Sequence, residues 1–464
     1  MMALERLAAA IGAADVLNPA PVELRDLAYD TRAVGPGALF FCVRGAHADG
    51  HDLARAAVDA GAAALVVEHA LDLDVPQLVV ADTRVAMAPA ADEFFGRPTE
   101  ELEVAGVTGT NGKTTTTFLL FAILAAAGRR PGLVGTIEAR VGGERRGVKR
   151  TTPEAIDLQR LFREMLDAGD RSVAIEASSH ASALHRLDRV RFSALVFTNL
   201  SHEHLDFHAD MEDYFQAKRR LFVEGTPPAA VNVGDEYGRR LAAERPDALT
   251  FGLAPGAEVG PDVLAGVDLK LRGRFNVENA LGAVAAARLL GIDDGAIKRG
   301  LESVRGVPGR FERIDEGQPF EVVVDYAHKP LALETILRAA RELTTGRLIC
   351  VFGCGGDRDR EKRPEMGRIA SELADVVIVT NDNPRSEDPE AIVAAILAGA
   401  AGDVEVEPDR ARAIAHAVES AREGDVVVIA GKGAEQGQEF ADRVVPFDDR
   451  DAAREALRKL GART

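Results

Sequence analysis

The chain has 464 residues, of which 46% are hydrophobic and 28% are charged, a composition typical of a globular protein with several domains. Its formal net charge of −18 argues against the broad basic surface that non-specific nucleic-acid binding requires. No segment approaches the roughly 18 uninterrupted apolar residues of a membrane span, and no signal-peptide pattern opens the chain, so we expect a cytoplasmic protein without membrane insertion.

Residues 1–98 predict a small α/β domain. Strand-like runs alternate with short alanine-rich helical stretches, and the runs occupy 38–43, 63–68 and 77–82. A polar turn, Asp30-Thr31-Arg32, precedes the first of these runs. From the residues alone, this turn is either a binding loop or a plain connection.

Residues 104–128 read as an apolar strand, a loop of glycines and threonines, one lysine and then a helix. Such a turn directs several backbone N–H groups and the helix dipole at one spot, which attracts phosphate. Lys113 can reach the outer phosphates of a nucleotide, and the Thr114 hydroxyl is placed to bind Mg2+. Val107 stands where the usual P-loop has glycine, so a simple strand-to-helix turn remains the alternative to an ATP site.

The central region, 99–307, continues with two runs, 171–178 and 192–200, that are too apolar to face water on either side. Continuous apolar strands alternating with helices predict a parallel sheet covered on both faces. Polar residues close the first run, at 176–180, and follow the second, at 201–208. Because ligands bind beyond the carboxyl ends of parallel strands, we expect these loops to share a cleft with the P-loop.

The histidines at 202, 204 and 208, together with Asp206, are compatible with a zinc site. We expect Mg2+ here instead, because the loop follows a strand end beside the expected nucleotide cleft. Magnesium prefers oxygen ligands, so an imidazole would be an unusual addition, and structural roles for His202 and His208 stay open. Glu176 ends an apolar strand, where an uncompensated carboxylate is costly. We therefore favour metal binding by Glu176.

Lys218 lies in a predicted helix whose apolar side comes from Phe215, Leu221 and Phe222. Most lysines in such helices are solvated surface charges. The pattern alone therefore favours an exposed lysine.

Pro308 and Gly309 separate two periodic regions, which places a domain boundary near residue 307. The last domain, 308–464, contains four strand-like runs, each followed by a loop and a helical pattern, at 321–328, 347–354, 375–382 and 425–433. Its glycine-rich loop has Arg358 where a dinucleotide fingerprint has its third glycine, so we expect no second nucleotide site. Cys42, Cys350 and Cys354 suit neither a disulfide framework nor a zinc site, so we expect buried thiols.

Ten motifs in order resemble the Mur ligases, the amide ligases of peptidoglycan assembly, over nearly the whole chain. They are GTNGKT (109–114), TTP (151–153), EASSH (176–180), FTNLSHEHLDFH (197–208), YFQAK (214–218), RGRFNVENAL (272–281), GVPGRFE (306–312), VDYAH (324–328), FGCGGDRDREKRP (352–364) and NDNPRSEDP (381–389). The resemblance implies three α/β domains: an N-terminal UDP-binding domain, a central ATPase domain with a parallel sheet and a C-terminal Rossmann-like domain.

The resemblance also implies binding residues for a UDP-muramoyl-dipeptide and for ATP. The UDP-substrate residues are Thr31, Thr151, Thr152, Ser178 and Arg186, while Leu184 replaces a frequent glutamine. The ATP residues are Gly109, Thr110, Asn111, Gly112, Lys113, Thr114, Thr115, Asn276, Asn279, Arg310 and Asp325.

For catalysis the resemblance implies Lys113, Glu176, His204 and Lys218. Glu176 and His204 match magnesium ligands, and Lys218 matches a lysine carbamylated by CO2. The resemblance therefore replaces the prediction that Lys218 is an exposed surface charge. A carbamate makes chemical sense because it turns a cation that repels Mg2+ into an oxygen-bearing anion. The expected metal ligands are thus Thr114, Glu176, His204 and the carbamate of Lys218.

The DNPR motif (382–385) is that of diaminopimelate-adding members of the family. Lysine-adding members lack its arginine, whose guanidinium would pair with the extra carboxylate of diaminopimelate. The implied amino-acid pocket consists of Arg358, Asp382, Asn383, Pro384, Arg385, Gly431 and Glu435, with Ala434 replacing a common histidine.

We expect an ATP-dependent ligase that works through an acyl phosphate with UDP-muramoyl-dipeptide, meso-diaminopimelate and ATP. The alternatives are a lysine-adding ligase, a folylpolyglutamate-type ligase, or a nucleotide-binding relative without catalysis. We expect a monomer, although no sequence pattern determines the number of subunits.

Overall fold

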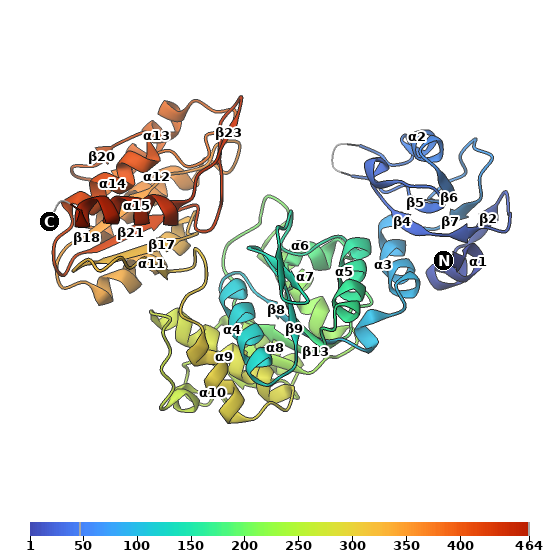
Figure 1. The fold of residues 1–464 in the computed structure, drawn as a ribbon, viewed down its shortest axis with the longest axis horizontal. Helices are drawn as coiled ribbons and strands as arrows, with labels where there is room; N and C mark the ends of the chain where they lie inside the picture. The colour runs from blue at the N-terminus through green and yellow to red at the C-terminus, as the bar shows by residue number, and fades with distance from the viewer. Residues whose placement is uncertain (46–47, 463–464) are drawn as a thin grey trace. The chain divides into compact units, whose positions relative to one another are not determined.

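The computed structural model describes residues 1–45 and 48–462. They form two compact units, Met1–Val267 with Glu278–Ser303, and Asp268–Val277 with Val304–Thr464. Three large sheets carry the fold, with five, eight and six strands, and each is flanked by helices (Figure 1). The expected α/β class is therefore confirmed, and each predicted domain contains one of the three sheets. The domain boundaries at 98 and 307 stay a prediction.

The N-terminal sheet has the order β2-β7-β6-β5-β4 and is parallel except for β2. Side chains alternate across β5, so Leu39 and Phe41 pack with α1 and α3, whereas Phe40 packs with α2. Burial on both faces explains the uninterrupted apolar run. The bounds are β2 (Asp15–Leu17), β4 (Asp26–Ala28), β5 (Ala38–Phe41), β6 (Ala62–Val67), β7 (Gln77–Val79), α1 (Leu4–Ile11), α2 (Ala54–Asp59) and α3 (Thr83–Phe94).

The central sheet has the order β11-β10-β9-β12-β8-β13-β14-β15 and is parallel from β9 to β15. Helices α5, α7 and α8 share one core with its strands, and α4 packs on β8, β9 and β12. Its strands are β8 (Glu103–Thr108), β9 (Pro131–Val134), β10 (Ala139–Val141), β11 (Glu144–Arg146), β12 (Ser172–Glu176), β13 (Phe192–Phe197), β14 (Ala229–Asn232) and β15 (Leu249–Phe251). The helices of the region are α4 (Lys113–Ala126), α5 (Ala155–Asp167), α6 (Ser179–Ala183), α7 (Met211–Val223), α8 (Glu236–Glu244), α9 (Arg274–Leu289) and α10 (Asp294–Ser303).

The C-terminal sheet has the order β16-β17-β21-β18-β19-β20, with only β16 antiparallel. Cys350 and Phe352 of β18 face α11, α12 and α13, and Ile349 and Val351 face α14 and α15. The strands are β16 (Glu312–Arg313), β17 (Glu321–Asp325), β18 (Leu348–Phe352), β19 (Val376–Val379), β20 (Glu405–Val406) and β21 (Val426–Ala430). The helices are α11 (Pro330–Leu343), α12 (Lys362–Leu373), α13 (Pro389–Leu397), α14 (Arg410–Ser420) and α15 (Asp449–Gly461).

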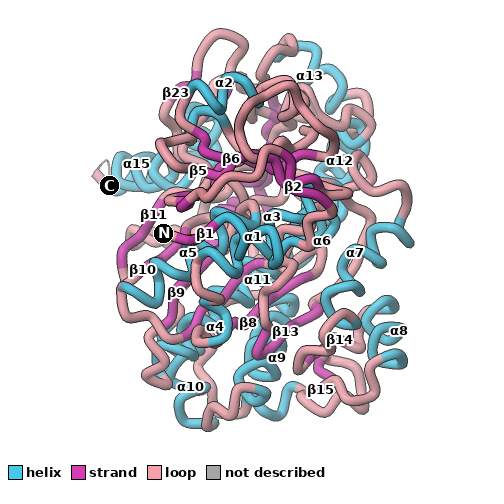
Figure 2. Tube along the Cα trace, turned by 90° about the vertical axis from the view of Figure 1, so that its right-hand side faces the viewer, coloured by secondary structure: helices cyan, strands magenta, loops and turns pink. Residues whose placement is uncertain are grey.

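Figure 2 shows the helices, strands and connecting loops of the chain by colour. The shorter elements are β1 (Met2–Ala3), β3 (Glu23–Leu24), β22 (Gln438–Glu439), β23 (Val444–Val445) and the 3-10 turns η1 (Thr31–Ala33), η2 (Pro98–Glu100) and η3 (Pro261–Leu264). All three cysteines are buried and free, as predicted. Among residues 1–45 and 48–462, no helix is both long and apolar enough to cross a membrane.

Candidate active site

The P-loop is the turn between β8 and α4. Gly109 and Gly112 have φ angles of 148° and 85°, which favour glycine. A Cβ at Gly109 would collide with the Thr198 hydroxyl, and one at Gly112 would collide with the Asn279 side chain. The α4 helix begins at Lys113, so the predicted strand, loop and helix are confirmed. Helix N-termini of this kind attract anions in general.

Two lysines meet at this loop. Lys113 Nζ donates to the carbonyl oxygens of Gly109, at 2.9 Å, and of Thr110, at 2.8 Å. Lys218 Nζ donates to the same Gly109 oxygen at 2.8 Å. Lys218 is only 1% exposed, so the expectation of a solvated helix charge is wrong. Burial, followed by the charge of Lys113, lowers the pKa of Lys218 well below its ordinary value.

Glu176 ends β12 with a buried carboxylate. It accepts hydrogen bonds from Thr114 Oγ1 at 3.1 Å, from the Thr136 N–H at 2.7 Å and from Thr136 Oγ1 at 3.0 Å. The structure thus brings together Thr114 and Glu176, two of the expected metal ligands. Sequence reasoning missed Thr136, although its place directly after the parallel strand β9 could have indicated it.

Tyr214, which sequence reasoning also missed, lies beside the histidine-containing loop 201–208. The ring of His204 lies 5.8 Å from the Tyr214 ring, and Lys218 Nζ lies 4.7 Å from the same ring. The Tyr214 hydroxyl lies 3.1 Å from Thr110 Oγ1. Tyr214 therefore connects the P-loop with both remaining expected metal ligands, His204 and Lys218.

The other histidines have distinct surroundings. His208 is buried and contacts Ser179 Oγ at 3.0 Å, which fits its structural reading, whereas His202 is exposed. His180 stacks on Phe207, and burial lowers its pKa to about 4. Within the described ranges, no group of three or more His, Cys, Asp or Glu side chains is arranged to hold a metal ion.

Four of the predicted UDP-substrate residues lie beside Glu176. Thr152 Oγ1 donates to the Glu176 carbonyl at 2.7 Å and to Ser178 Oγ at 3.2 Å. Thr151 Oγ1 lies 3.1 Å from Thr136 Oγ1, and Arg186 Nη1 donates to the Thr152 carbonyl at 3.3 Å. These hydroxyls and the guanidinium form one largely buried polar network beside Glu176, in which Arg186 also pairs with Glu154 at 2.8 Å.

The fifth, Thr31, opens η1, and its neighbour Asp30 caps that turn by accepting from the Arg32 N–H. No hydrogen bond among the described residues joins Thr31 to the other four. The two domains of this unit are nevertheless linked, because Tyr29 donates to Asp157 of α5 at 2.5 Å.

The remaining expected ATP residues fall in both units. Asn279 belongs to the first, where its carbonyl accepts from Thr116 Oγ1 at 3.4 Å. Asn276, Arg310 and Asp325 belong to the second. There Asp325 is buried and accepts from the Phe311 N–H at 2.7 Å, and burial raises its pKa.

The predicted amino-acid residues gather at the carboxyl ends of β19 and β21, in the second unit. Asn383 Nδ2 donates to Glu435 Oε2 at 3.0 Å, and a Cβ at Gly431 would collide with the Asp382 carboxylate. Pro384 is buried beside them, and Arg358 is exposed. Sequence reasoning missed the fully buried Lys432, which donates to Asn383 Oδ1 at 2.8 Å and to Glu435 Oε2 at 3.0 Å.

Arg385, the arginine of the DNPR motif, is only partly buried. Its side chain is 26% exposed and forms an ion pair with Glu439 at 2.7 Å. The arginine thus has a partner within the chain before any substrate binds.

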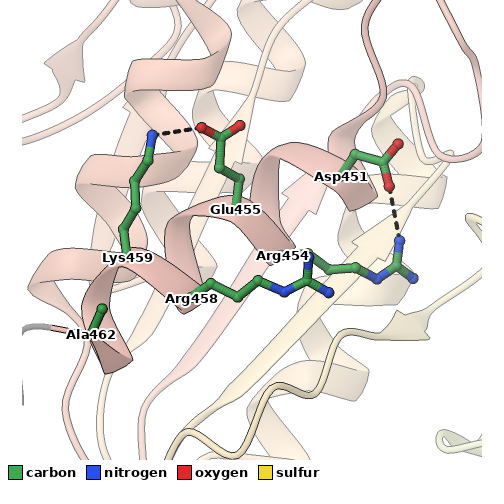
Figure 3. Close-up of a pocket in the computed structure, with 6 residues that line it drawn as sticks. All are labelled: Asp451, Arg454, Glu455, Arg458, Lys459 and Ala462. Atoms are coloured by element: carbon green, nitrogen blue, oxygen red, sulfur yellow. Dashed lines mark hydrogen bonds and ion pairs between the residues drawn. The ribbon is translucent and has the colours of Figure 1, made fainter.

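A separate surface hollow runs along α15 (Figure 3). Four of its charged residues pair with one another, Asp451 with Arg454 at 3.1 Å and Glu455 with Lys459 at 2.6 Å, whereas Arg458 pairs with Glu316 at 2.9 Å. None of the predicted site residues is among its lining residues, which are Asp451, Arg454, Glu455, Arg458, Lys459 and Ala462.

Comparison with known proteins agrees with this arrangement. Three family models match, described as "Mur ligase family, catalytic domain" at residues 23–95, "Mur ligase middle domain" at 107–287 and "Mur ligase, glutamate ligase domain" at 309–433. The UDP-N-acetylmuramoyl-L-alanyl-D-glutamate--2,6-diaminopimelate ligase of Solibacter usitatus is 46% identical over 95% of each chain. That of Streptomyces coelicolor is 47% identical over 94% of this chain and 93% of the relative.

Solved structures give the same answer. A structure of UDP-N-acetylmuramoyl-L-alanyl-D-glutamate--2,6-diaminopimelate ligase matches with a TM-score of 0.68 and 31% identity, over 94% of this chain and 95% of that one. Folylpolyglutamate synthase of Mycobacterium tuberculosis, complexed with ADP and AMPPCP, matches with a TM-score of 0.59 and 18% identity, over 82% of this chain and 96% of that one, which shows a shared fold alone. From its full-length relatives and its three matched domains, the chain belongs to the Mur ligase family.

Proposed function

We propose that this chain is an ATP-dependent ligase that adds meso-diaminopimelate to UDP-N-acetylmuramoyl-L-alanyl-D-glutamate in peptidoglycan synthesis. The observation that carries the proposal is near-half identity, over about 95% of the chain, to relatives named as ligases of 2,6-diaminopimelate. The chain keeps the DNPR arginine, Arg385, which separates this activity from lysine addition. Because the reaction consumes ATP, we place it in the cytoplasm, and we propose a monomer.

The reaction joins phosphoryl transfer to acyl transfer. The D-glutamyl carboxylate attacks the γ-phosphorus of ATP, which gives an acyl phosphate and ADP. The diaminopimelate amine then attacks the acyl carbon, the amide bond forms, and phosphate leaves while the amine loses a proton. No protein nucleophile is needed, so the work of the chain is positioning and charge neutralisation.

Lys113 and the P-loop amides are the groups that offset charge on the transferring phosphoryl group. In the structure Lys113 Nζ lies on the carbonyls of Gly109 and Thr110, within its own loop. It must leave these carbonyls to reach a γ-phosphate. Thr151, Thr152, Ser178 and Arg186 would hold the UDP-substrate beside this loop.

The donor set beside the P-loop fits Mg2+. The Thr114 hydroxyl and the Glu176 carboxylate lie 3.1 Å apart and supply the oxygen ligands that Mg2+ prefers, and few protein ligands suffice because Mg2+ keeps several waters. His204 and a carbamate on Lys218 would complete the set. When bound, Mg2+ neutralises phosphate charge at this place.

Burial of Lys218 supports the carbamate. Only a neutral amine attacks CO2, and the lowered pKa of Lys218 favours the neutral form. The amine nitrogen bonds to the carbon of CO2 and loses a proton, which leaves an anion with two oxygens. The neighbouring Lys113 ammonium can stabilise that anion.

Mass spectrometry of the reaction product tests the proposal. The purified chain, given ATP, Mg2+, UDP-muramoyl-dipeptide and meso-diaminopimelate, should yield the dipeptide substrate enlarged by one diaminopimelate residue. A product enlarged by lysine when both amino acids are supplied equally would favour the lysine-adding alternative. No enlarged product with either amino acid would favour the catalytically silent alternative.

A further inference from the structure

Arg385 is paired by its backbone with a residue that sequence reasoning did not single out, Glu439. The Arg385 N–H donates to the Glu439 carbonyl at 3.0 Å, and Arg385 forms a bridge with the next residue, Phe440. Arg385 has a φ of 53°, in the left-handed region that a bulky side chain rarely adopts. Such backbone persists where its surroundings fix it, and here the fixing contacts come from the segment containing Glu439.

The side chains of the two residues are joined as well. Arg385 Nε donates to Glu439 Oε2 at 2.7 Å, and Arg385 Nη1 donates to the Gly356 carbonyl at 2.8 Å. These contacts hold the planar guanidinium at two of its three nitrogens. Within residues 1–45 and 48–462, Nη2 makes no hydrogen bond, and the side chain is 26% exposed. The donors of Nη2 therefore remain for a ligand in this partly exposed side chain.

Glu439 also belongs to the hydrogen-bond network of the amino-acid pocket. Its N–H donates to Asn383 Oδ1 at 3.0 Å, and the same oxygen accepts from the buried Lys432. Asn383 in turn donates to Glu435. The segment containing Glu439 therefore fixes Asn383 through its backbone and Arg385 through both backbone and side chain.

We propose that Glu439 is a positioning residue for diaminopimelate, because its carboxylate orients the Arg385 guanidinium toward the distal carboxylate of this substrate. The inference rests on the proposed function. An arginine held at Nε loses less side-chain freedom when a carboxylate binds its other edge. The opposite role, in which Glu439 competes with the substrate for Arg385, predicts a change of opposite sign.

The test is the KM for meso-diaminopimelate of Glu439→Ala and Glu439→Gln. We expect Glu439→Ala to raise this KM about tenfold, the size of one lost charge-assisted hydrogen bond. Glu439→Gln should raise it less, because the amide oxygen still accepts from Nε. The KM for ATP and the kcat should stay within about twofold. An unchanged or lowered KM for diaminopimelate would overturn the proposal.

Three controls separate positioning from a structural effect. Glu439 is 48% exposed and its two backbone hydrogen bonds do not involve its side chain, so both variants should melt at the wild-type temperature. In an Arg385→Ala background, Glu439→Ala should raise the KM no further, because its effect passes through Arg385. Glu455→Gln on α15, which removes another exposed carboxylate of this unit, should change nothing.

Different results would overturn the proposed ligase function and the positioning role of Glu439. Wild-type protein without any diaminopimelate-dependent phosphate release would overturn the proposed function and this role of Glu439 with it. Active wild-type protein whose KM for diaminopimelate is insensitive to Glu439→Ala would overturn the role of Glu439 alone. An equal further loss when Glu439→Ala is added to Arg385→Ala would show that Glu439 does not act through Arg385.

Discussion

Lys113 and Lys218 place two amines on one carbonyl oxygen, that of Gly109, at 2.9 and 2.8 Å. Two neighbouring ammonium groups repel, and the buried one gives up its proton more readily. The lowered pKa of Lys218 follows from this arrangement. A basic side chain thus becomes, in its folded setting, a candidate nucleophile for CO2.

We predict that Lys218→Ala loses most phosphate-releasing activity and that acetate partly restores it, because acetate supplies the missing carboxylate oxygens. Lys113→Ala should also lose activity, but acetate should not help it, because an anion cannot replace a cation aimed at phosphate. Phosphate release measured with and without acetate separates the two. Full activity of untreated Lys218→Ala would exclude the carbamate role.

The thiols give a prediction about pH. Burial raises the pKa of Cys42, Cys350 and Cys354 to about 12, so at pH 8 the native thiols should react with a disulfide reagent only as fast as the chain unfolds. Unfolded thiols ionise near pH 9 and folded ones near pH 12. Burial of the neutral thiols therefore contributes to the stability of the fold below pH 9, and this contribution disappears as the pH rises toward 12. Labelling with and without denaturant checks this, and rapid labelling of native protein would contradict the burial.

Between elements, the contact of α10 with the P-loop helix α4 depends on Gly300. A Cβ at this position would collide with the backbone of Ile123 in α4, and backbone cannot move aside as a side-chain end can. We predict that Gly300→Ala destabilises the first unit by about 1–3 kcal/mol through overpacking. Thermal melting measures the loss.

The matched control is Gly295→Ala on the same helix. The nearest atoms to its Cβ are the ends of the flexible Asp293 and Arg299 side chains, so it should melt close to wild type. Equal melting temperatures for the two variants would show that α10 can shift away from α4 without cost.

The elements themselves were largely predictable. Strands such as β5, β12 and β18 are buried on both faces. A strand buried in this way has a continuous apolar sequence, which is easy to recognise. The pattern alone predicted an exposed Lys218, and this was wrong, although its spacing from the apolar residues of the helix indicates a buried position. Tyr214, Phe215, Lys218, Leu221 and Phe222 are the buried residues of α7, and Lys218 falls in the middle of that helical face.

The contacts that complete the sites were not predictable in this way. Thr136 reaches Glu176 across 40 residues, and Glu439 reaches Arg385 across 54. Hydrogen bonds between segments so distant leave no periodicity, because they depend on how strands are ordered in the sheet. The strand pattern indicated Glu176 and the family resemblance indicated Arg385, but only the fold shows their partners, Thr136 and Glu439.

At the scale of the whole molecule, the residues of the proposed reaction are divided between the two units. The P-loop, Glu176 and Lys218 lie in the first unit, and Arg385 and Glu435 lie in the second. With a net charge of −18, the chain has no overall field that favours anionic substrates, so we expect local groups such as Lys113 and Arg186 to attract them. Neither unit alone carries all the residues of the proposed reaction.

The most direct test is phosphate release by the full chain with ATP, Mg2+ and UDP-muramoyl-dipeptide, in parallel with meso-diaminopimelate, with L-lysine and with no amino acid. We predict rapid release with meso-diaminopimelate alone, and release at least about a hundredfold slower with lysine, because Arg385 would bind no distal carboxylate and its guanidinium would face an ammonium. Equal release with lysine, or no release with any amino acid, would contradict the proposed function.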